Sequence, residues 1–390
     1  MNLQINSISM RRFRRFRHLD IPFASRLNVF VGINGAGKST ILDAVAKMLS
    51  WVVRRLTSPQ ATGAGENISE SDIQNMADSS SMEMAAEMDG GALKWMLAKT
   101  RSGGKPDGAK SDLRSLTDHV KAIRQAGLPA SLPVLAVYTV NRAVLDVPLR
   151  IRIHHKFDTL ATYDNAFSGT ANFRTFFEWF REREDLENER KIDALEHGHA
   201  AGPEESELSA VKQALTAFLP EFRGWRVRRS PLRLEVRKGT EVLDIRQLSD
   251  GEKSLMAMIG DLARRMALAN PGRTDALAGS GVVLIDEVEL HLHPAWQRTV
   301  LPCLLKTFPN VQFLVTTHSP LVLAQLNTAL YRQHSAGEGP GREIDVFGLR
   351  DGRIASMLDP GTGLLMAGEM DEVANAVDDE FNRLLENGLA

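Results

Sequence analysis

The sequence predicts an α/β fold, in which helices flank a mixed, mostly parallel sheet and a phosphate-binding loop lies at one edge. Three observations predict this class. The run GINGAGKS (32–39) lies between an apolar strand pattern and a helical pattern. The runs GVVLIDE (281–287) and VQFLVTTH (311–318) are short and continuously apolar, and each ends in polar residues. Such runs are typical of buried parallel strands, whose carboxyl ends meet where phosphates bind.

Composition sets the limits of this prediction. The chain has 390 residues, of which 43% are apolar and 25% are charged, as in an ordinary folded protein. Lys plus Arg (47) nearly equals Asp plus Glu (49), so nucleic-acid binding would require a local basic patch. The single cysteine, Cys303, fits a reducing compartment. No run is long enough to span a bilayer and no signal peptide is evident, so we expect a cytoplasmic protein without a membrane partner.

Changes of pattern along the chain predict five parts. The first two belong to one lobe, the third is a helical insertion, and the fourth contains the later motifs. They are an N-terminal lobe with the glycine loop (1–56), a loop, hairpin and strand of that lobe (57–156), the helical insertion (157–222), the lobe with LSDGEKS and the two apolar runs (223–347), and C-terminal strands with a helix over 369–387 (348–390).

Local signals predict several individual elements. Apolar residues alternate about Asp89-Gly90-Gly91 and predict a β-hairpin with one buried face, part of an antiparallel β subdomain. Residues 57–81 are rich in Gly, Ser and Asn, which predicts a mobile loop. Ser111 is the expected N-cap of the next helix. The aromatic run FRTFFEWF (173–180) is expected either to fasten the insertion to the body or to anchor a partner.

The glycine loop matches G-x-x-x-x-G-K-[ST], the Walker A pattern. Its glycines let backbone N–H groups wrap phosphates, and the following helix adds positive potential. Lys38 is expected to reach the β- and γ-phosphates of ATP, and Ser39 to offer its hydroxyl to Mg²⁺. The strand before the loop and the helix after it argue against a chance glycine turn. The expected nucleotide-binding residues are Gly32, Asn34, Gly35, Ala36, Gly37, Lys38, Ser39 and Thr40.

Polar residues at the ends of the two apolar runs supply the expected catalytic groups. Asp286 is expected to hold Mg²⁺ through water, and Glu287 to orient and deprotonate the attacking water. His318 is expected to hydrogen-bond the γ-phosphate or that water. The alternatives are an ordinary loop start for the two acids and a structural role for a lone histidine.

GINGAGKS, LSDGEKS (248–254), VVLIDE and TTHS occur in the order typical of the ABC-type ATPase superfamily, which this chain resembles. The resemblance implies that LSDGEKS is a signature turn that caps the ATP held by a second, head-to-tail subunit. Ser249 and the backbone of Gly251 would then meet that γ-phosphate, and Glu252 replaces the usual glutamine. ATP would thus drive formation of a homodimer or a higher even-numbered oligomer. The arginine that reaches the nucleotide in related heads corresponds to Arg14.

DEVELHLHP (286–294) resembles the overcoming-lysogenization-defect ATPases and the AAA-type ATPases of bacterial defence operons. YTVNRAVLDVPLRI and FRTFFEWFREREDLENE resemble more specifically the Septu-type ATPases called PtuA and their retron-associated relatives. This resemblance implies a part in antiphage defence, with an HNH-type nuclease in trans; a retron reverse transcriptase and its DNA are the further candidate partners that it implies. The chain lacks a recognisable nuclease motif of its own, so we expect cleavage to be done by the partner.

Two other classes remain open. A DNA-repair clamp of RecF type has similar length and also dimerises on ATP. A transporter's nucleotide-binding subunit is disfavoured, because the segment after Glu287 lacks the SALD-like stretch of that class. Two basic stretches, RRFRRFR (11–17) and RGWRVRRSPLRLEVRK (223–238), either contact a nucleic-acid backbone or form solvated hairpin faces.

Overall fold

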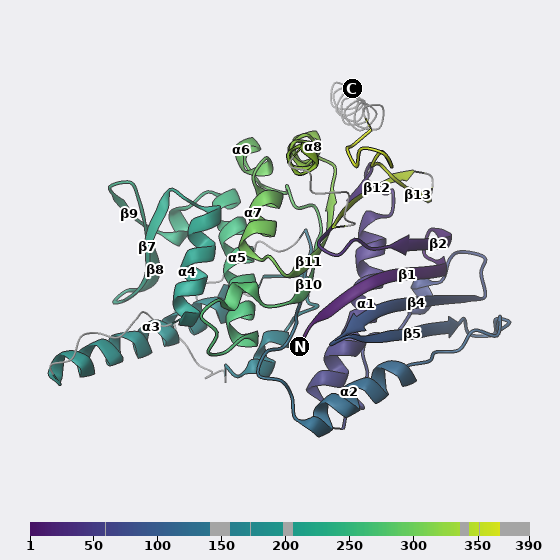
Figure 1. Ribbon diagram of the computed structural model, residues 1–390, viewed down its shortest axis with the longest axis horizontal. Helices are drawn as coiled ribbons and strands as arrows, with labels where there is room; N and C mark the ends of the chain where they lie inside the picture. Colours follow the sequence, from purple (N-terminus) through teal and green to yellow (C-terminus); the bar gives the residue numbers. More distant parts are fainter. Residues whose placement is uncertain are drawn as a thin grey trace.

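The computed structural model describes residues 1–58, 60–140, 157–171, 173–197, 206–335, 343–350 and 352–366. Its strands form three sheets (Figure 1). The central sheet contains, in spatial order, β13 (Arg353–Ser356), β12 (Ile344–Arg350), β3 (Leu27–Val31), β11 (Val311–Thr317), β10 (Gly281–Ile285) and β6 (Val134–Tyr138). The second contains β2 (Phe16–Pro22), β1 (Leu3–Phe13), β4 (Ser79–Met88) and β5 (Gly91–Thr100). The third contains β7 (Phe222–Arg229), β8 (Leu232–Lys238) and β9 (Glu241–Asp244).

Helices cover these sheets. They are α1 (Lys38–Thr57), α2 (Arg114–Ala126), α3 (Phe173–Glu196), α4 (Ser206–Phe218), α5 (Asp250–Ala269), α6 (Pro294–Gln297), α7 (Val300–Thr307) and α8 (Pro320–Ser335). Helices α4, α5 and α7 lie on one side of the central sheet, whereas α1 and the β1–β2–β4–β5 sheet lie on the other (Figure 1).

The central sheet is mixed, as predicted. Its strands β6, β10, β11, β3 and β12 run parallel, and β13 pairs antiparallel with β12. Strand β11 lies between β3 and β10, and all residues of these three strands are buried. Parallel alignment brings their carboxyl ends to one edge, so the glycine loop, the acids after β10 and His318 after β11 emerge close together.

The predicted hairpin is β4–β5, in which Met82, Met84, Leu93 and Trp95 are all buried. Asp89 and Gly90 connect the strands with φ of 48° and 77°, as a two-residue type I′ turn requires. The hairpin pairs with β1 through β4, and this sheet shares one apolar core with α1. The antiparallel β subdomain predicted from the sequence is therefore present.

Two local predictions were wrong. The expected mobile loop contains the buried Asp72, whose carboxylate accepts a hydrogen bond from Arg14 Nε (2.9 Å) and lies 3.3 Å from Lys47 Nζ. This pairing fastens the loop to α1 and to the turn between β1 and β2. Ser111 does not cap α2, which begins at Arg114, because its hydroxyl instead pairs with the backbone of Ala98 in β5. Serine side chains bond a free backbone group wherever one lies nearer than a helix end.

The helical insertion is part of the body. The aromatic side chains of α3 from Phe173 to Phe180 are at most 1% exposed. A Cβ on Gly260 of α5 would lie only 2.9 Å from the Phe176 ring, so α3 and α5 pack closely there. The aromatic run thus fastens the insertion to the core, and its rings are not available to a partner.

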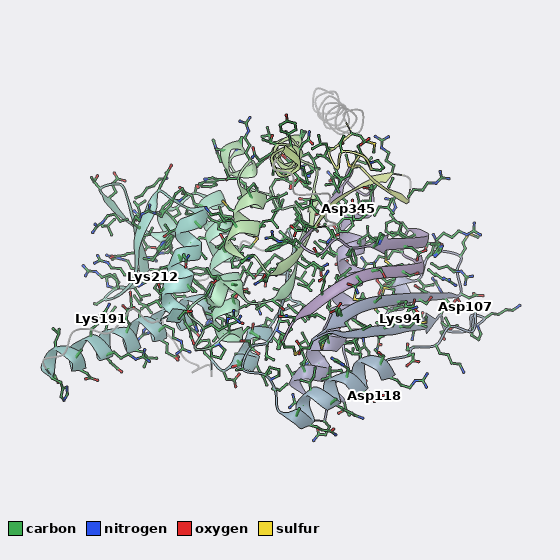
Figure 2. The ribbon with its side chains drawn as sticks, in the orientation of Figure 1. Lys94, Asp107, Asp118, Lys191, Lys212 and Asp345 are labelled. Atoms are coloured by element: carbon green, nitrogen blue, oxygen red, sulfur yellow. The ribbon has the colours of Figure 1, made fainter. Side chains whose placement is uncertain are left out.

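The far half of α3 extends beyond the core (Figure 1). Along α3, Arg181 pairs with Asp185 (3.5 Å) and Lys191 pairs with Glu187, each across one turn of the helix. Lys191 and Lys212 approach Glu187 from α3 and α4 (Figure 2), and the Lys212–Glu187 distance is 3.7 Å. Charged pairs therefore continue the α3–α4 contact where the aromatic packing ends.

A buried charged network joins α5 to the central sheet. Asp261, Arg264 and Arg265 are each at most 1% exposed. Asp261 accepts hydrogen bonds from Arg264 (2.9 Å), Arg265 (2.8 Å) and the Tyr138 hydroxyl (3.0 Å). Burial opposes ionisation of Asp261, but the two arginines outweigh it and hold the pKa of that carboxyl below its ordinary value. Tyr138 ends β6, so the network fixes α5 against the strand beside β10.

Two predictions lie outside the described residues. They concern the C-terminal helix at 369–387 and most of YTVNRAVLDVPLRI, including Asn141 and Arg142. In the ranges given above, none of the helices combines the length and the apolar character needed to cross a membrane.

Candidate functional site

The glycine loop runs from the end of β3 to the start of α1. A Cβ on Gly32 would lie 2.8 Å from the Leu349 carbonyl oxygen of β12, so only glycine fits there. Gly35 and Gly37 have φ of 75° and 106°, which glycine adopts at little cost. Lys38 is the first residue of α1, and its ammonium donates to the carbonyls of Gly32 (2.6 Å) and Ile33 (3.1 Å). The loop therefore curls around a buried positive charge at a helix N-terminus.

Two neighbouring arginines of the β1–β2 turn lie in different surroundings. Arg14 donates to Asp72 (2.9 Å) and to Asp43 of α1 (2.5 Å). Burial lowers the pKa of Arg14, but these two carboxylates outweigh it and raise the pKa. In contrast, a Cβ on Gly37 would lie 2.8 Å from Arg15 Cδ. The arginine that touches the glycine loop is thus Arg15, whereas the predicted nucleotide contact, Arg14, is held by two acids beside it.

Side chains of α1 and β11 hold the two acids that follow β10, Asp286 and Glu287. Asp286 accepts hydrogen bonds from the Ser39 hydroxyl (2.9 Å) and the Thr316 hydroxyl (2.5 Å). The Thr316 hydroxyl also accepts from the backbone N–H of Glu287 (2.7 Å). Glu287 has φ of 46°, a left-handed conformation that costs a non-glycine residue about 1–3 kcal/mol. Thr316 thus holds Asp286 by its side chain and Glu287 by its backbone.

His318 is held by a carboxylate that the sequence motifs did not identify. Glu289 is buried, and its Oε1 accepts the backbone N–H of His318 at 2.7 Å. The same oxygen lies 3.1 Å from His318 Nδ1. With Nδ1 facing Glu289, Nε2 is the ring atom left to bond another group. Glu289 therefore fixes the orientation of a side chain that is itself 42% exposed.

The chemistry of this edge fits a magnesium nucleotide. Mg²⁺ prefers oxygen ligands and keeps several of its waters. The Ser39 hydroxyl and the Asp286 carboxylate are such ligands, and their mutual hydrogen bond already places them side by side. When bound, Mg²⁺ would neutralise part of the phosphate charge at this edge.

The LSDGEKS turn forms a capping box at the start of α5. The backbone N–H of Ser249 donates to Glu252 Oε2 (2.7 Å), and that of Glu252 donates to Ser249 Oγ (3.3 Å). Lys238 of β8 donates to Glu252 Oε1 at 2.8 Å. Burial opposes ionisation of Glu252, but these hydrogen bonds outweigh it and lower its pKa. The turn is therefore rigid before any ligand or partner binds.

Gly251 is closely packed within its own chain. A Cβ at this position would lie 2.3 Å from the carbonyl oxygen of His291, a clash that requires the backbone to move. His293, in the same ELHLHP segment, caps α6 by accepting the Ala295 N–H at 3.3 Å. This segment therefore packs against the signature turn, and any side chain at position 251 disturbs that packing directly.

Sequence reasoning missed Thr316, Glu289 and Lys238. Thr316 and Glu289 lie within motifs already identified, where a buried polar residue beside catalytic positions is a usable signal. Lys238 gives no such signal, because it meets Glu252 only through the pairing of a distant hairpin.

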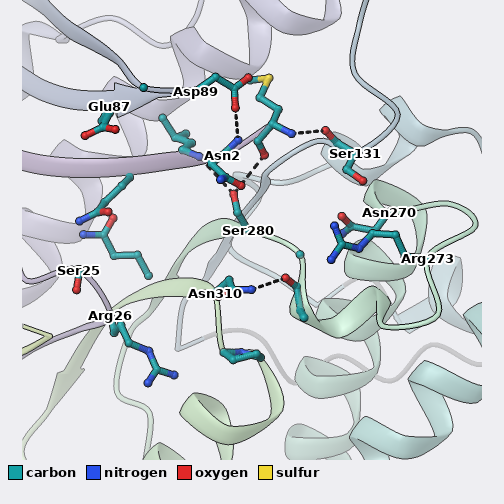
Figure 3. Close-up of a pocket in the computed structure, with 18 residues that line it drawn as sticks. Asn2, Ser25, Arg26, Glu87, Asp89, Ser131, Asn270, Arg273, Ser280 and Asn310 are labelled. Carbon is teal, nitrogen blue, oxygen red and sulfur yellow. Dashed lines mark hydrogen bonds between the residues drawn. The ribbon is translucent and has the colours of Figure 1, made fainter. Parts of the chain in front are cut away.

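A polar cavity of about 660 Å³ lies elsewhere, where β10 and β11 begin (Figure 3). Its lining includes Asn2, Asp89, Ser280 and Gln312. Several of these groups bond one another or nearby backbone, such as the Asn2 N–H and Asp89 (2.6 Å). The cavity is at the amino ends of the parallel strands and contributes nothing to the phosphate edge.

Known proteins resemble this chain in sequence and in fold. A family model described as "AAA domain" matches residues 7–222, and one described as "AAA domain, putative AbiEii toxin, Type IV TA system" matches 144–324. The head of an SMC protein, solved with the C-winged helix domain of ScpA, superposes with a TM-score of 0.51 at 16% identity, covering 90% of this chain and 97% of that one. That likeness concerns the fold alone.

Curated relatives are more similar. The chain is 32% identical to the "Retron Ec83 probable ATPase" of Escherichia coli, covering 82% of this chain and 69% of that one. It is 28% identical to the "Retron Vc95 probable ATPase" of Vibrio cholerae, covering 84% and 72%. A segment of 82 residues, 21% of this chain and 11% of the other, is 39% identical to the Septu protein PtuA of Bacillus mycoides. The chain therefore belongs to the AAA-domain family that contains the retron-associated probable ATPases and is homologous to Septu PtuA.

Proposed function

We propose that this protein binds and hydrolyses ATP and dimerises around it, and that the ATP-bound assembly regulates a partner effector in antiphage defence. The observation that carries the proposal is the linked arrangement of Ser39, Asp286, Thr316 and Glu287 beside the glycine loop. It brings the residues expected to bind phosphate, Mg²⁺ and the attacking water to one edge of one sheet.

In the proposed reaction, each residue of this edge has one task. The backbone N–H groups of 32–39 and the Lys38 ammonium hold the β- and γ-phosphates, and Arg15 supplements them from the β1–β2 turn. Ser39 and Asp286 would hold Mg²⁺, which would neutralise part of the phosphate charge. Glu287 accepts the proton of the attacking water. His318, oriented by Glu289, hydrogen-bonds the γ-phosphate or the attacking water through Nε2.

The second half of the site is proposed to come from another subunit. Within one chain, Ser249 and Glu252 bond each other, Lys238 donates to Glu252, and Gly251 packs on the segment after β10. These contacts prepare a rigid helix N-terminus, which favours an anion. We propose that this terminus meets the γ-phosphate held by the partner subunit in a head-to-tail dimer.

Mixing two inactive variants tests this arrangement. The substitution Gly251→Asp is unsuitable, because the clash with His291 would impair its own chain. Ser249→Asp is better: aspartate is as good an N-cap as serine, yet its carboxylate would repel the partner's γ-phosphate. Lys38→Ala and Ser249→Asp are each expected to be inactive. In a mixed dimer one site has both defects and the other has neither, so mixing should restore up to about a quarter of wild-type turnover.

Ser249→Asn is the matched control, because asparagine caps a helix without adding a charge. It is expected to keep most of the turnover. Wild-type turnover by the Ser249→Asp protein alone would contradict the cross-subunit role of the signature turn.

The effector is proposed to be an HNH-type nuclease in trans, with a retron reverse transcriptase and its DNA as further candidate partners, all in the cytoplasm. The purified chain is then expected to hydrolyse ATP and to leave DNA and RNA intact. Co-expression with the neighbouring genes, followed by affinity purification, should recover a complex with nuclease activity. Deleting 157–220 cannot test the contact, because α3 supplies buried aromatics to the core. Charge reversal on the exposed end of α3, around Arg190, is the suitable variant.

Metal-dependent cleavage by the isolated chain would contradict this division of labour. The decisive control is Asp286→Ala, which removes the proposed Mg²⁺ ligand. If it abolished that cleavage as well as ATP turnover, the nuclease site would belong to this chain.

A further inference from the structure

One face of the three-stranded sheet carries many positive charges. Residues directly opposite each other in a sheet lie on the same face. Arg226, Glu235 and Asp244 form one such row across β7, β8 and β9. The opposite face packs on the core through Trp225, Val227, Leu234 and Val236, which are at most 7% exposed. We call the outward face, with the adjoining turn, the arginine face; its arginines are Arg223, Arg226, Arg228, Arg233, Arg237 and Arg246.

The charge on this face is unfavourable for folding alone. Arg228 lies opposite Arg233, and Arg223 lies opposite Arg237. Like charges directly opposite each other destabilise a sheet. Among the described residues of this face, Glu235 and Asp244 are the carboxylates that offset the six guanidinium groups, which leaves a formal charge of +4 on it. A surface that retains such repulsion is suited to an anionic ligand.

The buried carboxylate of Glu235 organises the arginines. It lies 2.9 Å from the Arg226 guanidinium and 2.6 Å from that of Arg233. Burial opposes its ionisation, but these hydrogen bonds outweigh it and hold the pKa of Glu235 below its ordinary value. Arg226 remains 52% exposed. The pairing therefore fixes the guanidinium while leaving much of it open to solvent.

The shape and chemistry of the face indicate which class of anionic ligand it binds. Arg226, Arg228, Arg233 and Arg246 line a hollow of about 720 Å³. Arg226 and Arg228 are two residues apart on β7, hence about 7 Å apart along the strand. Guanidinium groups bind phosphate oxygens in pairs, a geometry that lysine lacks. A ligand with phosphates repeated along its length satisfies several such groups at once.

We propose that the arginine face binds the phosphate backbone of a nucleic acid. A lipid bilayer is the poorer match, because a bilayer is flat whereas this face is hollowed, and Val242 is the one apolar side chain in its lining. The 223–238 stretch thus has a use beyond that of a solvated hairpin. The binding itself does not depend on the ATPase activity proposed above.

The arginine face is connected directly to the signature turn of the same chain. Residues 245–248 lead directly from β9 to Ser249. Lys238 of β8 also donates to Glu252 of the signature capping box at 2.8 Å. A nucleic acid bound to β7–β9 would therefore be linked to the turn that is proposed to cap ATP through this connection and through the Lys238–Glu252 contact.

Binding of fluorescent oligonucleotides, measured by anisotropy without nucleotide, tests the proposal. The variant is Arg228→Gln with Arg237→Gln, because the Arg228 guanidinium lies 3.7 Å from Glu235, farther from it than those of Arg226 and Arg233. Affinity for single-stranded and duplex DNA should fall by about tenfold or more, and the slope of log K against log salt should decrease by about 1.4 to 1.8. Arg228→Lys with Arg237→Lys keeps the charge but not the paired donors, so it should keep the salt slope and lose less affinity than the glutamine variant.

Two controls make the result specific. Lys110→Gln with Lys121→Gln removes two charges from the other lobe and should leave the affinity unchanged. Arg11→Gln with Arg17→Gln tests the other basic stretch. The proposal is wrong if the arginine-face variant, with unchanged melting temperature, binds DNA as the wild type does. It is equally wrong if only the Arg11/Arg17 variant loses affinity, or if the protein binds anionic vesicles but no oligonucleotide. Because the assay contains no ATP, repeating it with Lys38→Ala separates this inference from the ATPase proposal.

Discussion

Glu287→Gln is expected to lower ATP turnover by about 10²- to 10⁴-fold while leaving ATP binding intact. The amide still holds the attacking water, but it cannot accept its proton. Glutamine also keeps the size of the side chain, so the left-handed backbone held by Thr316 is preserved. Phosphate release at saturating ATP measures turnover, and binding of a fluorescent ATP analogue measures affinity. The exposed Glu182→Gln on α3 is the matched control and should behave as the wild type.

If Glu287→Gln kept ATP turnover within a few fold of wild type, the general base would have to be another residue. Equal loss of ATP binding and of turnover would instead assign Glu287 a structural role. Thr316→Val removes the hydroxyl that holds both Asp286 and Glu287. It should therefore reduce ATP turnover even though the Glu287 carboxylate is still present.

Lys38→Ala is expected to reduce ATP affinity by roughly 30-fold to several thousand-fold, the effect of removing one member of a desolvated charge pair. The Lys38 side chain is almost fully buried in the glycine loop, and its ammonium already accommodates oxygen acceptors from Gly32 and Ile33. Isothermal titration with ATP and Mg²⁺ measures the change. Lys121→Ala on α2 removes the same charge from an exposed site and is the control. Unchanged affinity in Lys38→Ala would place the nucleotide elsewhere on the molecule.

The central fold was predictable because its signals are local. A strand, the glycine loop and a helix follow one another in GINGAGKST and its flanks, and two short apolar runs could only be buried strands. Asp89-Gly90 likewise specifies its own turn. In each case a few consecutive residues determine the backbone, so no distant contact was needed to predict the element.

What the sequence did not predict depends on contacts between distant segments. Thr316 and Glu287 are 29 residues apart, and Lys238 and Glu252 meet through the third sheet. Ser111 bonds the edge of β5 instead of capping α2, which its neighbours in the sequence could not indicate. The same holds for the consecutive residues Arg14 and Arg15. Their surroundings differ because Arg14 pairs with the carboxylates of Asp43 and Asp72, which are distant in the sequence.

The central claim is that ATP joins two subunits through the signature turn of each. Sedimentation or mass photometry of Glu287→Gln, with and without ATP, tests it most directly, because this variant should retain ATP. We expect ATP to convert the protein to an even-numbered assembly. Adding Ser249→Asp should abolish that conversion, and adding Ser249→Asn should not. An ATP-dependent assembly that forms equally well with Ser249→Asp, or no assembly of Glu287→Gln with ATP bound, would contradict the claim.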